Sequence, residues 1–197
     1  MPDRIGSVER KTAETAISVR IDLDGTGQSR IQTPLPFLSH MLEQIARHGL
    51  FDLEVDATGD VEIDGHHTTE DLGIVLGKAV LQALGDRKGI QRYGSATLPM
   101  DEALVRVAMD LSGRAFFVWR LDLPKAKLGT FDSELAEVFF EAFARSAQVN
   151  LHVHKLEGTN LHHLIEITFK AFSKALRQAT TLDPRATGVP STKGSLD

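Results

Sequence analysis

The sequence contains no cysteine, a single tryptophan, a single tyrosine and no long apolar run. Without cysteine there can be no disulfide, thiolate nucleophile or cysteine-type zinc site, which suits a reducing compartment such as the cytoplasm. Without an apolar run of about 18 residues we expect no membrane-spanning helix, and the N-terminal residues lack the apolar segment of a secretion signal. We therefore expect a cytoplasmic protein that does not bind membranes.

Clusters of basic residues are also missing. The 22 lysines and arginines are interleaved with 27 acidic residues, and the net charge is −5. This pattern argues against nucleic-acid binding, although a local basic pocket remains compatible with it. Apolar residues make up 42% of the 197 residues, which is enough for a full hydrophobic core.

What the sequence does contain is a repeat. The segment His66-His67-Thr68-Thr69-Glu70 returns ninety-six residues later as His162-His163-Leu164-Ile165-Glu166. The match continues at the same spacing, because Lys78-Ala79 corresponds to Lys174-Ala175. One copy of a histidine pair followed by a glutamate is a modest hint of a metal site, whereas a duplicated copy with its following helix is a strong one.

The repeat extends to the predicted secondary structure, for which alternating apolar residues indicate strands and helical spacing indicates helices. In the first half these patterns predict strands at 14–23, 29–33 and 50–58 and helices at 37–47 and 68–84. In the second half they predict strands at 101–111, 115–121 and 149–155 and helices at 133–147 and 161–180. Each half reads β-β-α-β-α, with its first two strands expected to form a hairpin.

This order predicts an α+β fold made of two internally duplicated halves, 1–90 and 91–182. Each half would be a small sheet with two helices on one face, and the helices of the two halves would pack together within one integrated domain. The tail, 183–197, is rich in Gly, Pro, Ser and Thr and has no periodicity.

The histidine pairs predict two metal ions. On a helix His66 and Glu70 share a face, whereas His67 points about 100° away, so adjacent histidines serve two ions more naturally than one. The duplicate, His162-His163 with Glu166, supplies a matching arm. Each ion would be held by both copies of the repeat, or across a subunit interface. Histidine and carboxylate ligands without sulfur suit Mn, Fe, Zn, Ni or Co.

The two halves are not equivalent. His40 lies on the apolar stripe of the first predicted helix, where a buried histidine needs a partner such as a metal. In this part of the repeat the two halves correspond at an offset of 98 residues, which places Val138 at the position of His40. Valine cannot bind a metal. One ion should therefore have one protein ligand fewer, unless Glu134, Glu137 or water replaces it.

Basic residues could form the other part of a site. Arg92, Arg114, Lys170 and Lys193 lie near predicted turns or helices, and Ser191-Thr192-Lys193-Gly194 combines hydroxyls, a cation and a flexible glycine that could close over a phosphate. Taken one at a time, each is better explained as a solvated charge.

Longer segments make the chain similar to a known family, the imidazoleglycerol-phosphate dehydratases of histidine biosynthesis. The resemblance runs essentially end to end. It rests on FLSHMLEQIARHG (37–49), DGHHTTEDLG (64–73), PMDEAL (99–104), DLSGR (110–114), EGTNLHHLIEITFKAFSKALRQA (157–179) and DPRATGVPSTKGSL (183–196). It implies a metal-dependent lyase that converts imidazoleglycerol phosphate to imidazole-acetol phosphate and water. It also implies a homo-oligomer of 24 subunits, with active sites between subunits and two Mn²⁺ ions in each.

The same resemblance implies a role for particular residues. One ion would be held by His40, His67, His162 and Glu166. The other would be held by His66, Glu70 and His163, with Val138 where the family has histidine or glutamate. The substrate would contact Glu14, Arg92, Arg114, Lys170, Ser191 and Lys193. The implied catalytic residues are Glu14, Glu70, Glu166 and His67.

In this scheme the two ions hold the imidazole ring as an imidazolate, and a glutamate carries the proton. The tail would close over the substrate as a lid. The residues alone leave two other functions open. One is a dinuclear metallohydrolase with a bridging water; the other is a metal-binding assembly protein without catalysis, which Val138 favours. Metal-dependent turnover of imidazoleglycerol phosphate separates the three.

Overall fold

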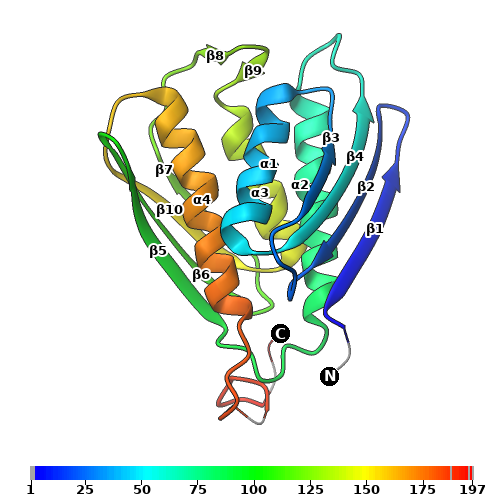
Figure 1. The fold of residues 1–197 in the computed structure, drawn as a ribbon, viewed down its shortest axis with the longest axis vertical. Coiled ribbons are helices and arrows are strands. Elements are labelled where there is room, and N and C mark those ends of the chain that lie inside the picture. The colour runs from blue at the N-terminus through cyan, green and yellow to red at the C-terminus, as the bar shows by residue number, and fades with distance from the viewer. Residues whose placement is uncertain (1–2, 187, 195, 197) are drawn as a thin grey trace.

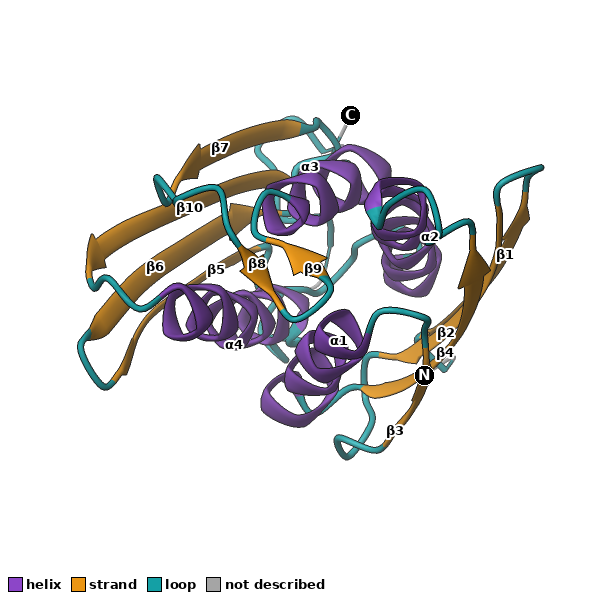
Figure 2. Cartoon of the chain, turned by 90° about the horizontal axis from the view of Figure 1, so that it is seen from above, coloured by secondary structure: helices purple, strands orange, loops and turns teal. Residues whose placement is uncertain are grey.

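In this computed structural model, which describes residues 3–186, 188–194 and 196, two four-stranded sheets enclose four helices (Figures 1 and 2). The first half contains β1 (Ile5–Lys11), β2 (Thr15–Asp22), β3 (Ser29–Gln32), α1 (Pro36–Gly49), β4 (Asp52–Gly59) and α2 (His66–Leu84). The second contains β5 (Tyr93–Met100), β6 (Ala103–Asp110), β7 (Phe116–Arg120), the short β8 (Lys127–Leu128) and β9 (Phe131–Asp132), α3 (Leu135–Ala147), β10 (Asn150–Glu157) and α4 (Leu161–Thr180). The predicted α+β fold of two similar halves is confirmed.

Each half begins with a strand, β1 or β5, that the sequence patterns did not predict. Both strands carry a glycine where a helix crosses them. A Cβ on Gly6 would overlap the carbonyl oxygen of Ala79 in α2, and a Cβ on Gly94 would overlap that of Ala175 in α4. Since the helix occupies the space of a side chain at this point, the apolar alternation that reveals a strand is interrupted.

The predicted hairpin between the first two expected strands of each half is wrong. The strand orders are β1-β2-β4-β3 and β5-β6-β10-β7, and β3 and β7 run parallel to their single neighbours, β4 and β10. In the first half, Asp52 at the start of β4 accepts hydrogen bonds from the backbone N–H groups of Thr26 (2.7 Å) and Gln28 (2.9 Å). Asp52 thus fixes the connection between β2 and β3 at the start of β4. The chain crosses β4 there, and β3 pairs with the far side of β4 instead of with β2.

The helices of the two halves pack together, as predicted. In the core, α2 lies against α3 and α1 lies against α4 (Figure 2). Gly73 and Gly77 let α3 approach α2 closely, because a Cβ at either position would lie within 3 Å of a carbonyl oxygen of α3. Between α3 and α4 the core is filled by a cluster of aromatic rings: Phe139, Phe140, Phe143, Phe169 and Phe172.

The four helices run in the same direction, with their first turns at the upper end of Figure 1 and the tail at the lower end. Within the described part of the chain, no helix is long and apolar enough to cross a membrane.

Candidate active site

One group of possible metal ligands lies between α1 and α4. The ligand atoms of His40, His162 and Glu166 are all within 4.8 Å of one another, and no other group of three was found among the described residues. Glu166 Oε2 lies 2.9 Å from His162 Nε2 and 3.6 Å from His40 Nε2. The expectation that His40 is buried is wrong, since 47% of its side chain is exposed. The buried face of α1 is filled by apolar residues, and His40 lies at its edge, facing α4.

Glu166 is the buried anion of this group, with only 9% of its side chain exposed. Burial by itself would raise the pKa of Glu166, but hydrogen bonds from Lys170 and His162 outweigh it and hold the pKa below its usual range. The Lys170 ammonium lies 2.6 Å from Glu166 Oε1. Lys170 therefore lies beside the metal-ligand group, although its ammonium cannot bind a metal itself. Glu166 remains a carboxylate able to bind a cation.

The matching arm on α2 is more open. His66 Nε2 lies 3.8 Å from Glu70 Oε2, and 48% of each side chain is exposed. The rings of His66 and His67 are nearly perpendicular (89°), as are those of His162 and His163 (86°). The two histidines of each pair also contact different carboxylates, so they face different directions, as the helical spacing predicts.

His67 and His163 each contact a carboxylate of their own half through Nδ1. His67 Nδ1 lies 2.9 Å from Asp60 Oδ2, and Glu14 Oε2 is farther away at 3.9 Å. His163 Nδ1 lies 2.8 Å from Glu102 Oε2. This contact and backbone N–H donors lower the pKa of Glu102 to about 2. Neither histidine joins the His40 group of its own chain.

Four of the six predicted substrate residues, Arg92, Arg114, Ser191 and Lys193, line one pocket, whereas Lys170 lies beside Glu166 and Glu14 lies near His67. A cavity of about 570 Å³ is lined by Arg92, Arg114, Pro190, Ser191, Thr192 and Lys193, among others. Arg92 is already paired: it donates to both oxygens of Asp110 (2.6 and 3.0 Å) and to the Pro190 carbonyl (2.8 Å). The bond to Asp110 raises the pKa of Arg92. Arg92 thus ties the tail to the second sheet.

This pocket and the metal-ligand group lie near opposite ends of α4, the helix that runs from the upper to the lower part of Figure 1. The backbone N–H of Arg92 binds the carbonyl of Ala179 in the last turn of α4, whereas His162 lies in the first turn. The intervening length of helix spans about 25 Å at 1.5 Å per residue. A single chain therefore does not bring the residues of this pocket to the group of His40, His162 and Glu166.

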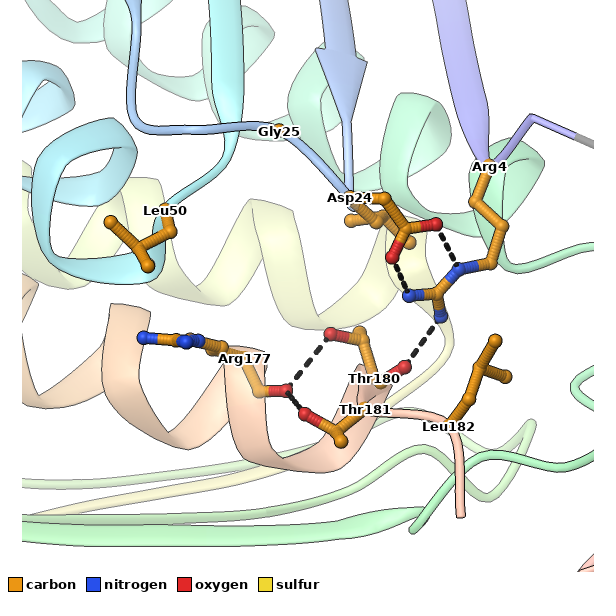
Figure 3. Close-up of a pocket in the computed structure, with 10 residues that line it drawn as sticks. Arg4, Asp24, Gly25, Leu50, Arg177, Thr180, Thr181 and Leu182 are labelled. Atoms are coloured by element: carbon orange, nitrogen blue, oxygen red, sulfur yellow. Dashed lines mark hydrogen bonds and ion pairs between the residues drawn. The ribbon is translucent and has the colours of Figure 1, made fainter. Parts of the chain in front are cut away.

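A further cavity of about 270 Å³ lies between the N-terminal segment and the end of α4 (Figure 3). Arg4 donates to both oxygens of Asp24 (2.8 and 2.5 Å) and to the Thr180 carbonyl (2.5 Å). None of the predicted site residues lines this cavity. This cavity lies where the two halves meet, and Arg4 links them by binding Asp24 of the first half and Thr180 of the second.

With this geometry in view, comparison with known proteins identifies the family. The family model described as imidazoleglycerol-phosphate dehydratase matches residues 33–176. The chain belongs to the imidazoleglycerol-phosphate dehydratase family. The predicted family and enzyme class are thus confirmed, since dehydratases of this kind are hydro-lyases.

Relatives and solved structures of this family match nearly end to end. A dehydratase of Geobacter sulfurreducens is 55% identical over 193 residues, covering 98% of this chain and 99% of the relative, and one of Paraburkholderia phytofirmans is 57% identical, covering 98% and 100%. A crystal structure of the dehydratase from Staphylococcus aureus subsp. aureus N315 has a TM-score of 0.82 at 41% identity, covering 91% of this chain and 99% of that one. A dehydratase from Pyrococcus furiosus in complex with (S)-C348 has a TM-score of 0.83 at 35% identity, covering 96% and 100%.

The sequence analysis did not predict the two carboxylates that contact His67 and His163, which are Asp60 and Glu102. Glu102 could have been found, because the first strands of the two halves correspond at an offset of 88 residues, which aligns Glu102 with the predicted Glu14 and Gly94 with Gly6. Asp60 had no such signal: its counterpart in the second half is Gly158, and only the fold brings the loop after β4 to His67.

Proposed function

We propose that this chain converts imidazoleglycerol phosphate to imidazole-acetol phosphate and water in histidine biosynthesis, and that it does so with two bound Mn²⁺ ions. The observation that carries the proposal is the group of His40, His162 and Glu166, in a chain similar end to end to dehydratases of that name.

The donor atoms suit such ions. They are imidazole nitrogens and carboxylate oxygens without sulfur, a set that binds Mn²⁺. His40, His162 and Glu166 would hold one ion and His66 and Glu70 the other. Because His67 and His163 face away from these groups, we propose that each completes a site on a neighbouring subunit. When bound, the ions would stabilise the negative charge of an imidazolate ring.

The chain's own residues supply orientation and proton transfer. Lys170 and His162 hold the Glu166 carboxylate in place, so Glu166 is fixed before any ligand arrives. The reaction removes a carbon-bound proton and releases a hydroxyl group as water, so a carboxylate must accept one proton and deliver one. Glu14 suits this role: it lies 3.9 Å from His67, is half exposed, and accepts no hydrogen bond from the described residues. Glu70, also half exposed, is the second candidate.

The phosphate would be bound by the pocket around Arg114, Ser191 and Lys193, with Arg92 holding the tail in place. Since this pocket lies about one helix length from the histidines of its own chain, the proposal requires residues from more than one subunit at each active site. An assembly of 24 subunits, with the tail as a lid, would meet that requirement.

The experiment is turnover of imidazoleglycerol phosphate by the full-length protein after chelator treatment, with and without Mn²⁺, followed by the absorbance of the enol and ketone product. We expect turnover that depends on Mn²⁺, and a metal analysis with two ions per subunit. No turnover at saturating Mn²⁺ would reject the dehydratase. Hydrolysis of a phosphate ester instead would favour a dinuclear metallohydrolase.

A further inference from the structure

We propose that Asp60 and Glu102 are positioning residues, which hold His67 and His163 through Nδ1 so that the Nε2 atoms of both rings serve as the metal donors. This inference rests on the proposed function, because it concerns how two of the proposed ligands are oriented. It assigns a role to two carboxylates that do not touch the metal-ligand group themselves.

The geometry of both contacts has the same form. Asp60 Oδ2 lies 2.9 Å from His67 Nδ1, and Glu102 Oε2 lies 2.8 Å from His163 Nδ1. A carboxylate that accepts the Nδ1 proton fixes the tautomer and the rotation of an imidazole ring, and it leaves Nε2 as the basic atom. Among the described residues, neither Nε2 atom has a hydrogen-bond partner; the exposed Asp101 lies 3.9 Å from His163 Nε2, beyond hydrogen-bond distance.

Each carboxylate is itself held firmly. Glu102 Oε1 accepts hydrogen bonds from the backbone N–H groups of Asn160 (2.7 Å) and Thr159 (3.2 Å), just before α4. Asp60 keeps only 15% of its side chain exposed, and its Oδ1 is buried without a partner among the described residues. A buried oxygen without a partner is unfavourable, so stability alone does not account for a carboxylate at this position.

The repeat shows that the two halves reach this contact by different routes. The repeat aligns Glu102 with Glu14, and Asp60 with Gly158. Gly158 has a φ of +113°, and a Cβ there would lie 2.6 Å from the Cα of Ala103, so the second half cannot place a carboxylate at that position. Glu102 therefore orients the histidine of the second half. In the first half Asp60 does so, and Glu14, at 3.9 Å from His67 Nδ1, accepts no hydrogen bond from the described residues and is available as a proton carrier.

The test compares Asp60→Asn and Glu102→Gln, which keep the shape of each side chain, with wild type and with Asp122→Asn, an exposed control in the connection after β7. Mn²⁺ binding to chelator-treated full-length protein is measured by calorimetry and by electron paramagnetic resonance. We expect each variant to bind one of the two ions about 10- to 100-fold more weakly. The control should bind as wild type, and thermal unfolding of the metal-free protein should be nearly unchanged.

A double-mutant cycle separates positioning from a general structural effect. In a His67→Ala background, Asp60→Asn should cause no further loss of Mn²⁺ affinity, because Asp60 acts through His67. The pair His163→Ala and Glu102→Gln gives the same test in the other half, should one variant fail to fold. Wild-type affinity in both single variants, or additive losses in the cycle, would overturn the inference. Wild-type protein without Mn²⁺ binding or turnover would instead reject the proposed function.

Discussion

The two halves share one backbone plan but differ in the polar groups that they bury. In the first half, Asp71 of α2 accepts hydrogen bonds from Arg10 Nε (2.8 Å) and Thr15 Oγ1 (2.5 Å) beneath the sheet. The corresponding positions in the second half, aligned by the repeat, hold Leu98, Ile167 and Ala103. A partly buried charged network, in which 37% of the Arg10 side chain is exposed, and a set of apolar residues therefore occupy equivalent places in one molecule.

This difference indicates which features the fold needs and which it only tolerates. The glycine at each strand–helix crossing is present in both halves, so the close approach of strand and helix depends on it. The Arg10–Asp71 ion pair is present in one half alone, so the fold does not depend on it. The proposed metal ligands are partly shared: both halves carry His-His-x-x-Glu, but the second half has Val138 where the first has His40.

The largest effect should come from the features that the halves share. Gly6→Ala or Gly94→Ala would place a methyl group on a carbonyl oxygen of α2 or α4, so either should lower the free energy of unfolding by more than about 4 kcal/mol. Chemical denaturation at a single protein concentration measures this. Gly188→Ala, at a position with no atom within 4 Å of the added Cβ, is the control and should change stability by less than about 0.5 kcal/mol. If one strand glycine tolerated alanine, the two crossings would not be equivalent.

The next prediction concerns the partly buried network. Asp71→Ala alone leaves the buried Thr15 hydroxyl without its acceptor, whereas the partly exposed Arg10 can still be hydrated, so we expect a loss of about 2 kcal/mol in the free energy of unfolding. The triple variant Arg10→Leu, Thr15→Ala and Asp71→Ile copies the second half. Since replacing a buried ion pair with well-packed apolar groups is often neutral, the triple variant should recover most of that loss. If the triple variant were less stable than Asp71→Ala, the two halves would not share one packing geometry.

Arg4 and Arg92, which the repeat aligns, allow an effect on stability to be distinguished from an effect on substrate binding. Arg4 and Arg92 each precede the first strand of their half, bind an aspartate through two nitrogens, and donate to a carbonyl of a C-terminal segment. Arg4→Met should cost about 1 kcal/mol, because its partner Asp24 is half exposed, and Arg92→Met about 2 kcal/mol. Only Arg92→Met should also raise the KM for the phosphorylated substrate, since Arg92 holds the tail at the proposed phosphate pocket. A raised KM in Arg4→Met would contradict this separation.

Much of this comparison could be predicted from the sequence, because helices and repeats leave local periodic signals. The four helices, the duplication and the different directions of His66 and His67 all follow from residue spacing. The strand order could not be predicted, since it depends on Asp52 capturing the connection after β2 across the sheet. The strands β1 and β5 were missed because a glycine interrupts their pattern, and the exposure of His40 depends on how α1 lies against α4.

The last prediction concerns the position at which the two halves differ within the proposed site. The repeat aligns α1 with α3 and α2 with α4, and α1 lies against α4 as α3 lies against α2. Val138 should therefore lie next to His66 and Glu70, just as His40 lies next to His162 and Glu166. Val138→His should supply the missing ligand and tighten Mn²⁺ binding at one of the two ions by about tenfold, or about 1.4 kcal/mol. The converse, His40→Val, should weaken the other ion by at least as much. A Mn²⁺ titration with two resolved affinities measures both changes. Equal affinities and stoichiometry in wild type and Val138→His would mean that another group already fills the position, and that the two ions are equivalent despite the difference in sequence.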